Sequence, residues 1–255
     1  MMNEETFVSK KAYLGRTDLY EIEIKDGVRE IGDWAFADCC NLGFVSLPVS
    51  VQKIGKGVVA GCKKLQSVMI RGLEHGESLQ YLLAYAFSEF EFSGVTILSE
   101  VGTNDWIEWF DGQLLSYLQM DDADGFAPFL AGGEEDYKDV RKAKEEYCLD
   151  KQIRKLGFVS ERMLLADTFP VQNSCASLFV QFLQTFISNL DVLSGLLQSA
   201  RTRGLVFMEL YVKLDLLTND MCQNLLNIQD GLDVELRTWL LSHMKSKNVW
   251  MDFSL

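Results

Sequence analysis

The segments LYEIEIKDGVREIG (residues 19–32) and LGFVSLPVSVQKIG (residues 42–55) carry apolar residues at the same positions when they are aligned at an offset of 23. The agreement continues through Cys39 and Cys62, and the pattern starts again at LQSVMI (65–70). Chance does not place so many coincidences in one register. The sequence therefore predicts a repeat of period 23, and a fixed period of this order is typical of stacked repeat proteins.

The third unit departs from this period. IGDWAF (31–36) has its counterpart in LLAYAF (82–87), at an offset of 51 where two periods would give 46. Five extra residues therefore predict an outward loop after residue 70, where glycines favour turns. FSGVTI (92–97) restores the strand pattern. We expect four strand segments and three intervening turns, of which the last is degenerate.

The pattern L-x-x-V-x-I predicts a short strand, because its fourth and sixth residues share one face by the two-residue alternation of strands. The I-G that follows returns the chain, and the glycine is expected to adopt a backbone conformation closed to other residues. No repeat buries its apolar face alone, so the units must stack into a common core. The predicted core ladders are Ile22, Val45, Val68 and Val95, and Ile24, Leu47, Ile70 and Ile97.

These residues resemble the leucine-rich repeat of the BspA type, whose units read approximately L-x-x-V-x-I-P-x-S-V-x-x-I-G-x-x-A-F-x-x-C-x-x. The resemblance covers residues 19–98, and it departs from the pattern in the third unit. The second unit carries Pro48, Ser50, Val51, Ile54, Gly55 and Cys62, and the first carries Ile31, Gly32, Ala35, Phe36 and Cys39. Members of this family are mostly bacterial binding and adhesion proteins, many of them exported, so the resemblance implies a binding module rather than an enzyme.

From about residue 104 the apolar period becomes helical. We expect helices near residues 105–119, 136–157, 159–168, 174–190, 191–200, 205–216, 218–228 and 233–246, with an acidic connector at 121–137. Gly157 is expected to end the second of them. The predicted fold is α+β: a short solenoid with its N-terminal cap in residues 1–100, then an all-helical domain in residues 101–255. That domain resembles ankyrin-like helix pairs, with a single compact bundle as the alternative.

Composition argues against several classes of partner. The net charge of −13 disfavours nucleic acid and anionic membranes, since both require a positive footprint. The basic residues between Arg141 and Lys155 alternate with acids and are predicted to form a solvated helix face. The N-terminal segment has no apolar stretch of a signal peptide, and no apolar run approaches the ~20 residues of a membrane span. The six cysteines are scattered and lack the spacing of metal ligands, so we expect them to be reduced thiols. Reduced thiols favour a cytoplasmic location.

No pattern in the chain predicts a catalytic centre, a metal site or a cofactor. Asp121, Asp122, Asp124 and Gly125 suggest a calcium loop, but the first and last ligand positions of such a loop would be methionine and alanine, so an acidic turn is favoured. His75 and His243 have no partner at metal spacing and are expected to be surface residues. The cysteines lie on apolar stripes or in the repeat ladder, where they read as structural.

We expect the function to be non-catalytic protein binding through the exposed strand face of the repeat, or at its junction with the helices. Between Arg71 and Lys138 there are fourteen acidic and no basic residues, which favours a solubilising surface or, alternatively, a face for a basic protein partner. The alternative functions are an enzyme that uses the acids of residues 105–124 and an exported adhesion protein. The candidate binding residues are Tyr20, Glu21, Glu23, Phe44, Ser46, Gln66, Met69 and Thr96.

Overall fold

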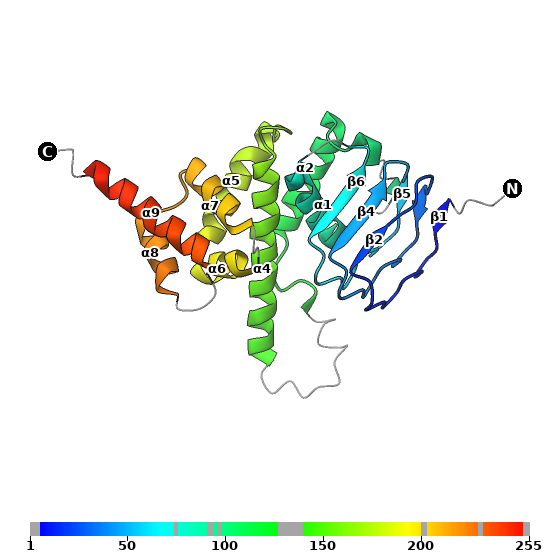
Figure 1. The fold of residues 1–255 in the computed structure, drawn as a ribbon, viewed down its shortest axis with the longest axis horizontal. Coiled ribbons are helices and arrows are strands. Elements are labelled where there is room, and N and C mark those ends of the chain that lie inside the picture. Colours follow the sequence, from blue (N-terminus) through cyan, green and yellow to red (C-terminus); the bar gives the residue numbers. More distant parts are fainter. Residues whose placement is uncertain are drawn as a thin grey trace. The chain divides into compact units, whose positions relative to one another are not determined.

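The computed structural model describes residues 6–73, 76–90, 94–95, 98–126, 140–199, 203–228 and 232–251 (Figure 1). The chain divides into two compact units, each described by itself below. The first, the repeat unit, comprises Met1–Tyr117 and Leu164–Gln172, and the second, the helical unit, comprises Leu118–Met163 and Asn173–Leu255. The sequence-based limits of 1–100 and 101–255 remain a prediction.

The repeat unit holds two small sheets. Strands β2 (Glu21–Glu23), β4 (Phe44–Pro48) and β6 (Ser67–Arg71) pair in parallel in that order. Strands β1 (Phe7–Val8), β3 (Glu30–Ile31) and β5 (Lys53–Ile54) pair in parallel in the second sheet, which β7 (Gly94–Val95) completes. In both sheets each residue pairs with its counterpart in the next repeat, as in Ile22–Val45–Val68.

The prediction that a fourth strand extends these ladders is wrong. Val95 does not extend the Ile22–Val45–Val68 ladder, because β7 runs antiparallel to β5 in the other sheet, with Val95 opposite Lys53. Ile97 lies outside the described residues. Residues 82–87 do not form a repeat turn either, since they belong to helix α1 (Glu77–Glu89). The run Leu79–Ala86 offers helix-forming residues without the glycine that opens the turn at position 32 or 55, so the local preference for helix prevails.

The repeat begins earlier than the sequence pattern indicated. Residues with positive φ recur at two repeat positions: Lys11, Trp34 and Gly57 at the first, and Gly15, Asp38 and Gly61 at the second. Backbone hydrogen bonds follow the same spacing, since Lys11 N donates to Asp33 O and Trp34 N donates to Lys56 O. Residues 7–18, expected to be a cap, thus already follow the path of the repeat. The apolar period of the sequence does not reveal them, because Lys11 and Trp34 share a backbone conformation but no side-chain character.

Gly32 and Gly55 are required for a reason other than the one predicted. Neither has positive φ. A Cβ atom on Gly32 would lie 2.6 Å from Lys10 N, and one on Gly55 would lie 2.7 Å from the carbonyl carbon of Gly32. Glycine therefore allows the backbones of successive repeats to approach each other.

The core of the repeat unit lies between the two sheets. Val45, Val68 and Ile31 are at most 1 % exposed, and Tyr13 stacks on Phe36 at 5.3 Å between ring centroids. The two repeat cysteines act alike: the Cys39 thiol donates to Tyr13 O and the Cys62 thiol donates to Phe36 O. These thiols satisfy buried carbonyls, which supports their structural assignment.

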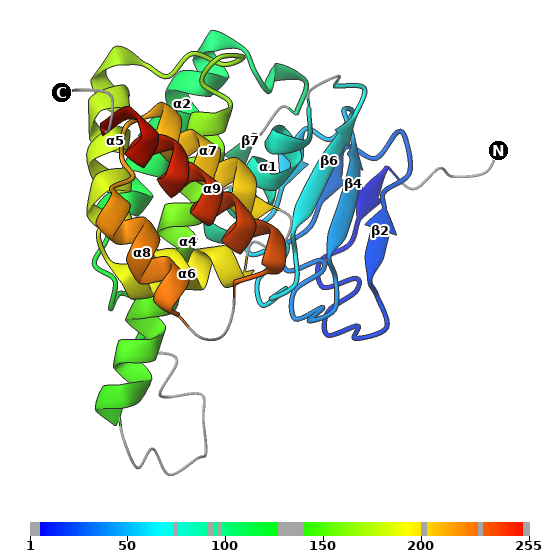
Figure 2. The same ribbon diagram turned by 60° about the vertical axis from the view of Figure 1, so that its left-hand side comes forward.

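Three further elements belong mainly to the repeat unit. Helix α1 packs alongside β6 (Figure 1, Figure 2), and Ser67 Oγ donates to Gln80 Oε1. A 3-10 turn (Leu98–Glu100) precedes α2 (Asn104–Gln119), which matches the helix predicted at 105–119. Within α2, Trp106 stacks on Phe110 at 4.7 Å between centroids, so its apolar stripe is part of the core.

The helical unit contains α4 (Val140–Leu164), α5 (Asn173–Ile187), α6 (Leu190–Ser199), α7 (Gly204–Lys213), α8 (Asn219–Asn227) and α9 (Val234–Met251). All six correspond to predicted helices, with one difference. Gly157 is buried within α4 instead of ending a helix, so the segments expected at 136–157 and 159–168 form one helix of 25 residues, which ends at Leu164 and not at 168. The predicted connector is described only as far as Phe126, where residues 121–125 form a turn.

Helices of this unit pack in sequence, α5 on α6, α6 on α7 and α8 on α9, and also two apart, α6 on α8 and α7 on α9. Two of the helices begin with a side-chain cap: Thr218 Oγ1 accepts from Met221 N, and Asp233 Oδ1 accepts from Leu236 N. Whether these helices are ankyrin-like pairs remains a prediction. No described helix is by itself long and apolar enough to cross a membrane, although α5 and α6 taken together, with a 96° bend, meet that criterion by length and composition.

Candidate functional site

The sheet β2–β4–β6 presents one side to the core and the other outward (Figure 1). Because side chains alternate along each strand and the three strands are in register, the outward residues form rows across the sheet. We call this surface the strand face. It consists of Glu21, Glu23, Phe44, Ser46, Pro48, Ser67, Met69 and Arg71.

The structure places most of the predicted binding residues on or beside the strand face. Tyr20 is 67 % exposed, and Glu21, Glu23 and Gln66 are also exposed. Phe44 and Met69, expected to be exposed, are half-buried. They lie on the outward side of β4 and β6, where their neighbours Val45 and Val68 are buried in the core.

Two predicted binding residues need separate mention. Ser46 is only 2 % exposed, so its assignment to an exposed face is wrong. The physical reason is the side chain of Arg71, whose Nη1 donates to Ser46 Oγ at 2.9 Å and covers it. Thr96 lies outside the described residues, so its place is not defined.

Arg71 organises the C-terminal end of the strand face. Its Nη2 donates to Ile24 O at 2.5 Å and contacts Asp26 Oδ1 at 2.6 Å, and its Nη1 lies 3.4 Å from Glu23 Oε1. The guanidinium thus reaches from β6 over β4 to the end of β2. A planar group with five N–H donors is suited to such a bridge, whereas a lysine ammonium is not.

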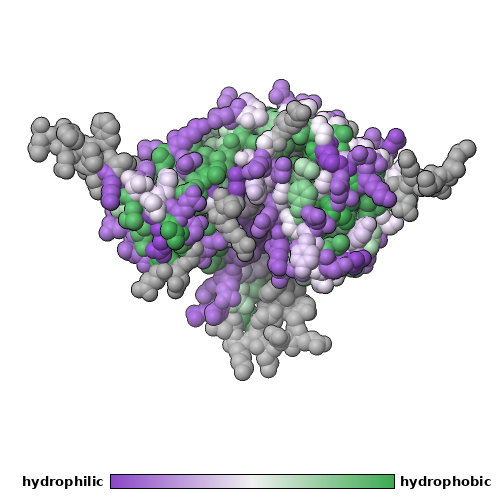
Figure 3. All heavy atoms as spheres, viewed as in Figure 1, coloured by the Kyte–Doolittle hydropathy of each residue, from purple (hydrophilic) through white to green (hydrophobic). Residues whose placement is uncertain are grey.

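On the strand face, polar groups therefore surround a small apolar area. Glu21 lies beside Phe44, Arg71 follows Met69 on β6, and Ser67, which donates to Gln80, lies opposite Phe44. Figure 3 shows hydrophobic residues among hydrophilic ones on this side of the repeat unit. An apolar centre with a polar rim is the arrangement found in protein interfaces.

A groove lies on the outward side of the other sheet. Two ion pairs cross it, Lys10–Asp33 at 3.7 Å and Lys53–Glu30 at 2.6 Å, and both are well exposed. Within each pair the opposite charges neutralise each other, so the groove presents little net charge to a ligand. Its lining residues are Phe7, Val8, Ser9, Lys10, Glu30, Gly32, Asp33, Lys53 and Gly55.

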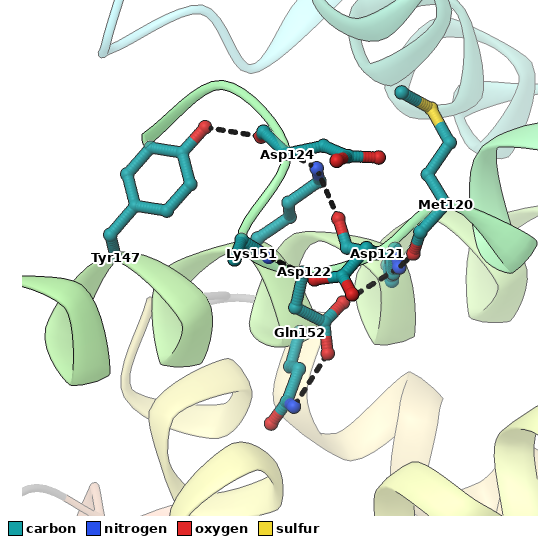
Figure 4. Close-up of polar contacts among 9 residues, drawn as sticks. Met120, Asp121, Asp122, Asp124, Tyr147, Lys151 and Gln152 are labelled. Carbon is teal, nitrogen blue, oxygen red and sulfur yellow. Dashed lines mark hydrogen bonds and ion pairs between the residues drawn. The ribbon is translucent and has the colours of Figure 1, made fainter. Parts of the chain in front are cut away.

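The acidic turn of the helical unit is held by lysines of α4 (Figure 4). Lys151 Nζ donates to Asp121 O at 2.9 Å and to Asp124 O at 3.0 Å. Lys155 Nζ donates to Met120 O at 2.5 Å and forms an ion pair with Asp122 Oδ1 at 2.7 Å. The turn thus binds ammonium groups through its backbone carbonyls, as a structural connection between two segments of this unit.

The basic stretch of α4 consequently has two parts. Lys151 and Lys155 are at most 5 % exposed, so the prediction of a solvated face is wrong for them. It holds for Arg141 and Lys142, which are exposed and pair with acids one helical turn later, Arg141 with Glu145 and Lys142 with Glu146. Sequence alone gave no signal for the difference, because the partners of the buried pair come from the distant turn before α4.

Within each unit, the described acids proposed for an enzyme are exposed or engaged by other groups. Asp105 and Glu108 are exposed on α2, and Asp122 is engaged by Lys155 and Gln152. Asp111 is buried and accepts a long hydrogen bond of 3.4 Å from Gln172 N. The described residues also include no group of three metal-ligating side chains. His75 lies outside the described residues, and the ring of His243 stacks on Trp239 at 5.0 Å.

Comparison with known families agrees with the strand register. Residues 3–105 match the family model of the BspA type leucine rich repeat region, in six copies. This part of the chain is thus similar to the BspA type leucine rich repeat region. The match starts before residue 19, as the ladders of positive-φ residues also do. Neither the search of curated proteins nor that of solved structures found a match. A match to this leucine-rich repeat family implies an interaction or adhesion module.

Proposed function

We propose that this protein is a non-catalytic interaction scaffold, in which a short leucine-rich-repeat solenoid of period 23 binds another protein through its strand face. The observation that carries the proposal is the pair Phe44 and Met69. They are apolar and partly exposed on adjacent strands, and the core does not require them. Such residues, with a polar rim, are typical of contact patches.

Acids beside the apolar pair support a partner with a basic surface. Residues 1–71 carry ten basic and nine acidic residues, a net charge of +1, so the remainder of the chain carries −14 and the total is −13. Within the repeat unit the exposed acids Glu21 and Glu23 border the apolar pair. Opposite charges at an interface rim mainly increase the association rate and the specificity. The location proposed is the cytoplasm, where an exposed cysteine such as Cys40 stays reduced.

The test is affinity purification from the native host with mass spectrometry, followed by the variant Phe44→Glu. A charge in the apolar centre should weaken binding of the identified partner at least tenfold, while the circular dichroism spectrum stays the same. Val234→Glu is the control, since Val234 is 81 % exposed on the helical unit and should not affect binding. Unchanged partner binding by a folded Phe44→Glu protein would refute the proposal.

A further inference from the structure

The first described repeat exposes several apolar side chains. Leu14 is 43 % exposed, whereas Ala37, its counterpart one repeat later, is 3 % exposed. Tyr20 and Phe7 are 67 % and 55 % exposed in the same repeat. Large apolar side chains are therefore accessible in this repeat.

The edge strand of the strand-face sheet, β2, belongs to this same repeat. Strand β2 pairs with β4 on one side, and among the residues that the structure describes no strand pairs with its other side. Tyr20 O and Ile24 N bond to β4, by accepting from Gly43 N and donating to Ser46 O. Since backbone groups alternate along a strand, those of Glu21 and Glu23 point toward the open edge. Such an edge is a template for pairing with an added strand.

We propose that this edge binds an extended segment of a protein partner by strand addition, and that the segment alternates basic and apolar residues. The inference rests on the proposed function, because it names the kind of partner that the repeat unit binds. A strand beside β2 would place one side chain next to Ile22, toward the core. Its two neighbours would lie beside Glu21 and Glu23, on the strand face.

The side chains of β2 decide which partner fits. The two carboxylates are exposed, and Glu23 is only loosely held by Arg71 at 3.4 Å. Opposite charges directly across a strand pair are favourable and like charges are unfavourable. Ile22 is half-buried although Val45 and Val68, its counterparts, are fully buried, so an apolar residue beside it would complete the ladder. The recognised pattern is therefore basic, apolar, basic.

The same argument disfavours a second copy of this chain. Antiparallel pairing of two β2 strands about Ile22 places Glu21 of one copy beside Glu23 of the other. Parallel pairing in register places each glutamate beside itself. Both arrangements bring four carboxylates together, which opposes self-association.

The experiment uses the full chain and three fluorescein-labelled octapeptides: alternating lysine and valine, four lysines followed by four valines, and alternating glutamate and valine. Binding is measured by fluorescence anisotropy at physiological salt. The alternating basic peptide should bind about tenfold more tightly than the block peptide of equal charge, and the acidic peptide should not bind. Equal binding of the two basic peptides would show attraction by charge alone and would overturn the proposal.

Variants test the location. The double variant Glu21→Gln, Glu23→Gln should weaken binding of the alternating basic peptide several-fold. Glu23→Pro, which removes an outward N–H group, should weaken this binding further. The matched control removes the same charge from exposed positions of α2, with Asp105→Asn and Glu108→Gln, and should change nothing. Equal weakening by the control pair would contradict the proposal. The proposal would also be contradicted if analytical ultracentrifugation showed a dimer of this chain whose dimerisation changes in the Glu21 and Glu23 variants.

The strand-addition and scaffold proposals can fail separately. If binding of the native partner depends on Phe44 but not on Glu21 and Glu23, the strand-addition proposal is wrong and the scaffold proposal stands. If binding of the native partner depends on none of these residues, the scaffold proposal fails, whether or not the peptides bind.

Discussion

Arg71 Nη1 donates to the hydroxyl of Ser46 at 2.9 Å, and this contact turns an outward-facing serine of β4 into a buried one. The same guanidinium also donates to Ile24 O at the end of β2. One side chain thus joins the ends of three strands that come from successive repeats. Because the Arg71 side chain covers Ser46, this part of the strand face is not accessible to a partner.

Replacing Arg71 by methionine should destabilise the repeat unit by about 1–3 kcal/mol, the cost of leaving buried hydrogen-bonding groups without partners. Urea unfolding followed by circular dichroism measures the change. Arg16→Met is the control, because Arg16 pairs with the exposed Asp18, and removing a surface pair changes stability by about 0–1 kcal/mol. Equal effects of the two variants would show that the contacts of Arg71 contribute no more than a surface pair.

The sequence predicted the register of the strands because the two-residue alternation and the period of 23 are local properties. Leu42, Val45 and Leu47 could be assigned to the core from their spacing alone, and each is at most 1 % exposed. The positions of Lys11 and Trp34 could not, because positive φ at these residues follows from the packing of adjacent repeats. The helix α1 in place of a turn also escaped prediction, since its apolar residues agree with both patterns.

Gly55→Ala should destabilise the repeat unit by about 1–3 kcal/mol, in the range of overpacked positions. The added methyl group would lie 2.8 Å from Asp33 Cα and 2.7 Å from the carbonyl carbon of Gly32, so two backbones would have to separate. Gly112→Ala is the control: a Cβ there meets nothing within 4 Å, and alanine within α2 should stabilise by about 0.5–1 kcal/mol. Thermal melts of the two variants should therefore shift in opposite directions, and a shift in the same direction would refute this reading of Gly55.

The candidate site was predictable only in part. Glu21 and Glu23 follow from strand alternation and are exposed as expected, and Tyr20, which precedes the strand, is exposed as well. The burial of Ser46 and of Lys155 depends on partners that are distant in the chain, and no periodic pattern of the sequence predicts such contacts. Long polar side chains are the residues whose burial a pattern of apolar positions describes least well, since their stems and charged ends differ in environment.

Lys155→Met should destabilise the helical unit by about 3 kcal/mol, because breaking a buried ion pair leaves an uncompensated charge. The carboxylate of Asp122 and the carbonyl of Met120 would both lose the ammonium group. Arg141→Met should have almost no effect, since Arg141 is exposed and lies 3.8 Å from Glu145. Urea unfolding of both variants checks this, and restoration of stability by adding Asp122→Asn to Lys155→Met would identify the unpaired charge as the cause.

Cys62 and Cys40 should differ strongly in reactivity. Burial raises the pKa of the Cys62 thiol to about 12, whereas Cys40 is exposed. At pH 8 only about one in ten thousand Cys62 thiols is then a thiolate, the form that reacts with iodoacetamide. Peptide mapping by mass spectrometry should show Cys40 modified and Cys62 protected in the folded protein, with both modified in urea. Labelling of Cys62 at the rate of Cys40 without urea would contradict its buried position in the repeat ladder.

Glu161 should make the helical unit less stable as the pH rises. Burial raises the pKa of this carboxyl above its ordinary 4.5, and the hydrogen bonds from Arg203 only partly oppose that effect. The folded state then holds the proton more tightly than the unfolded state, so the free energy of unfolding falls as the pH rises from about 4.5 through the folded pKa. Glu161→Gln cannot lose a proton. The stability of the wild type relative to this variant should therefore decline from pH 4 to pH 7 in urea titrations. Glu145→Gln, which removes an exposed carboxylate of α4, is the matched control. A relative stability that instead increases with pH at position 161 would mean that the ion pair with Arg203 outweighs burial, and that the charged carboxylate is the form the fold favours.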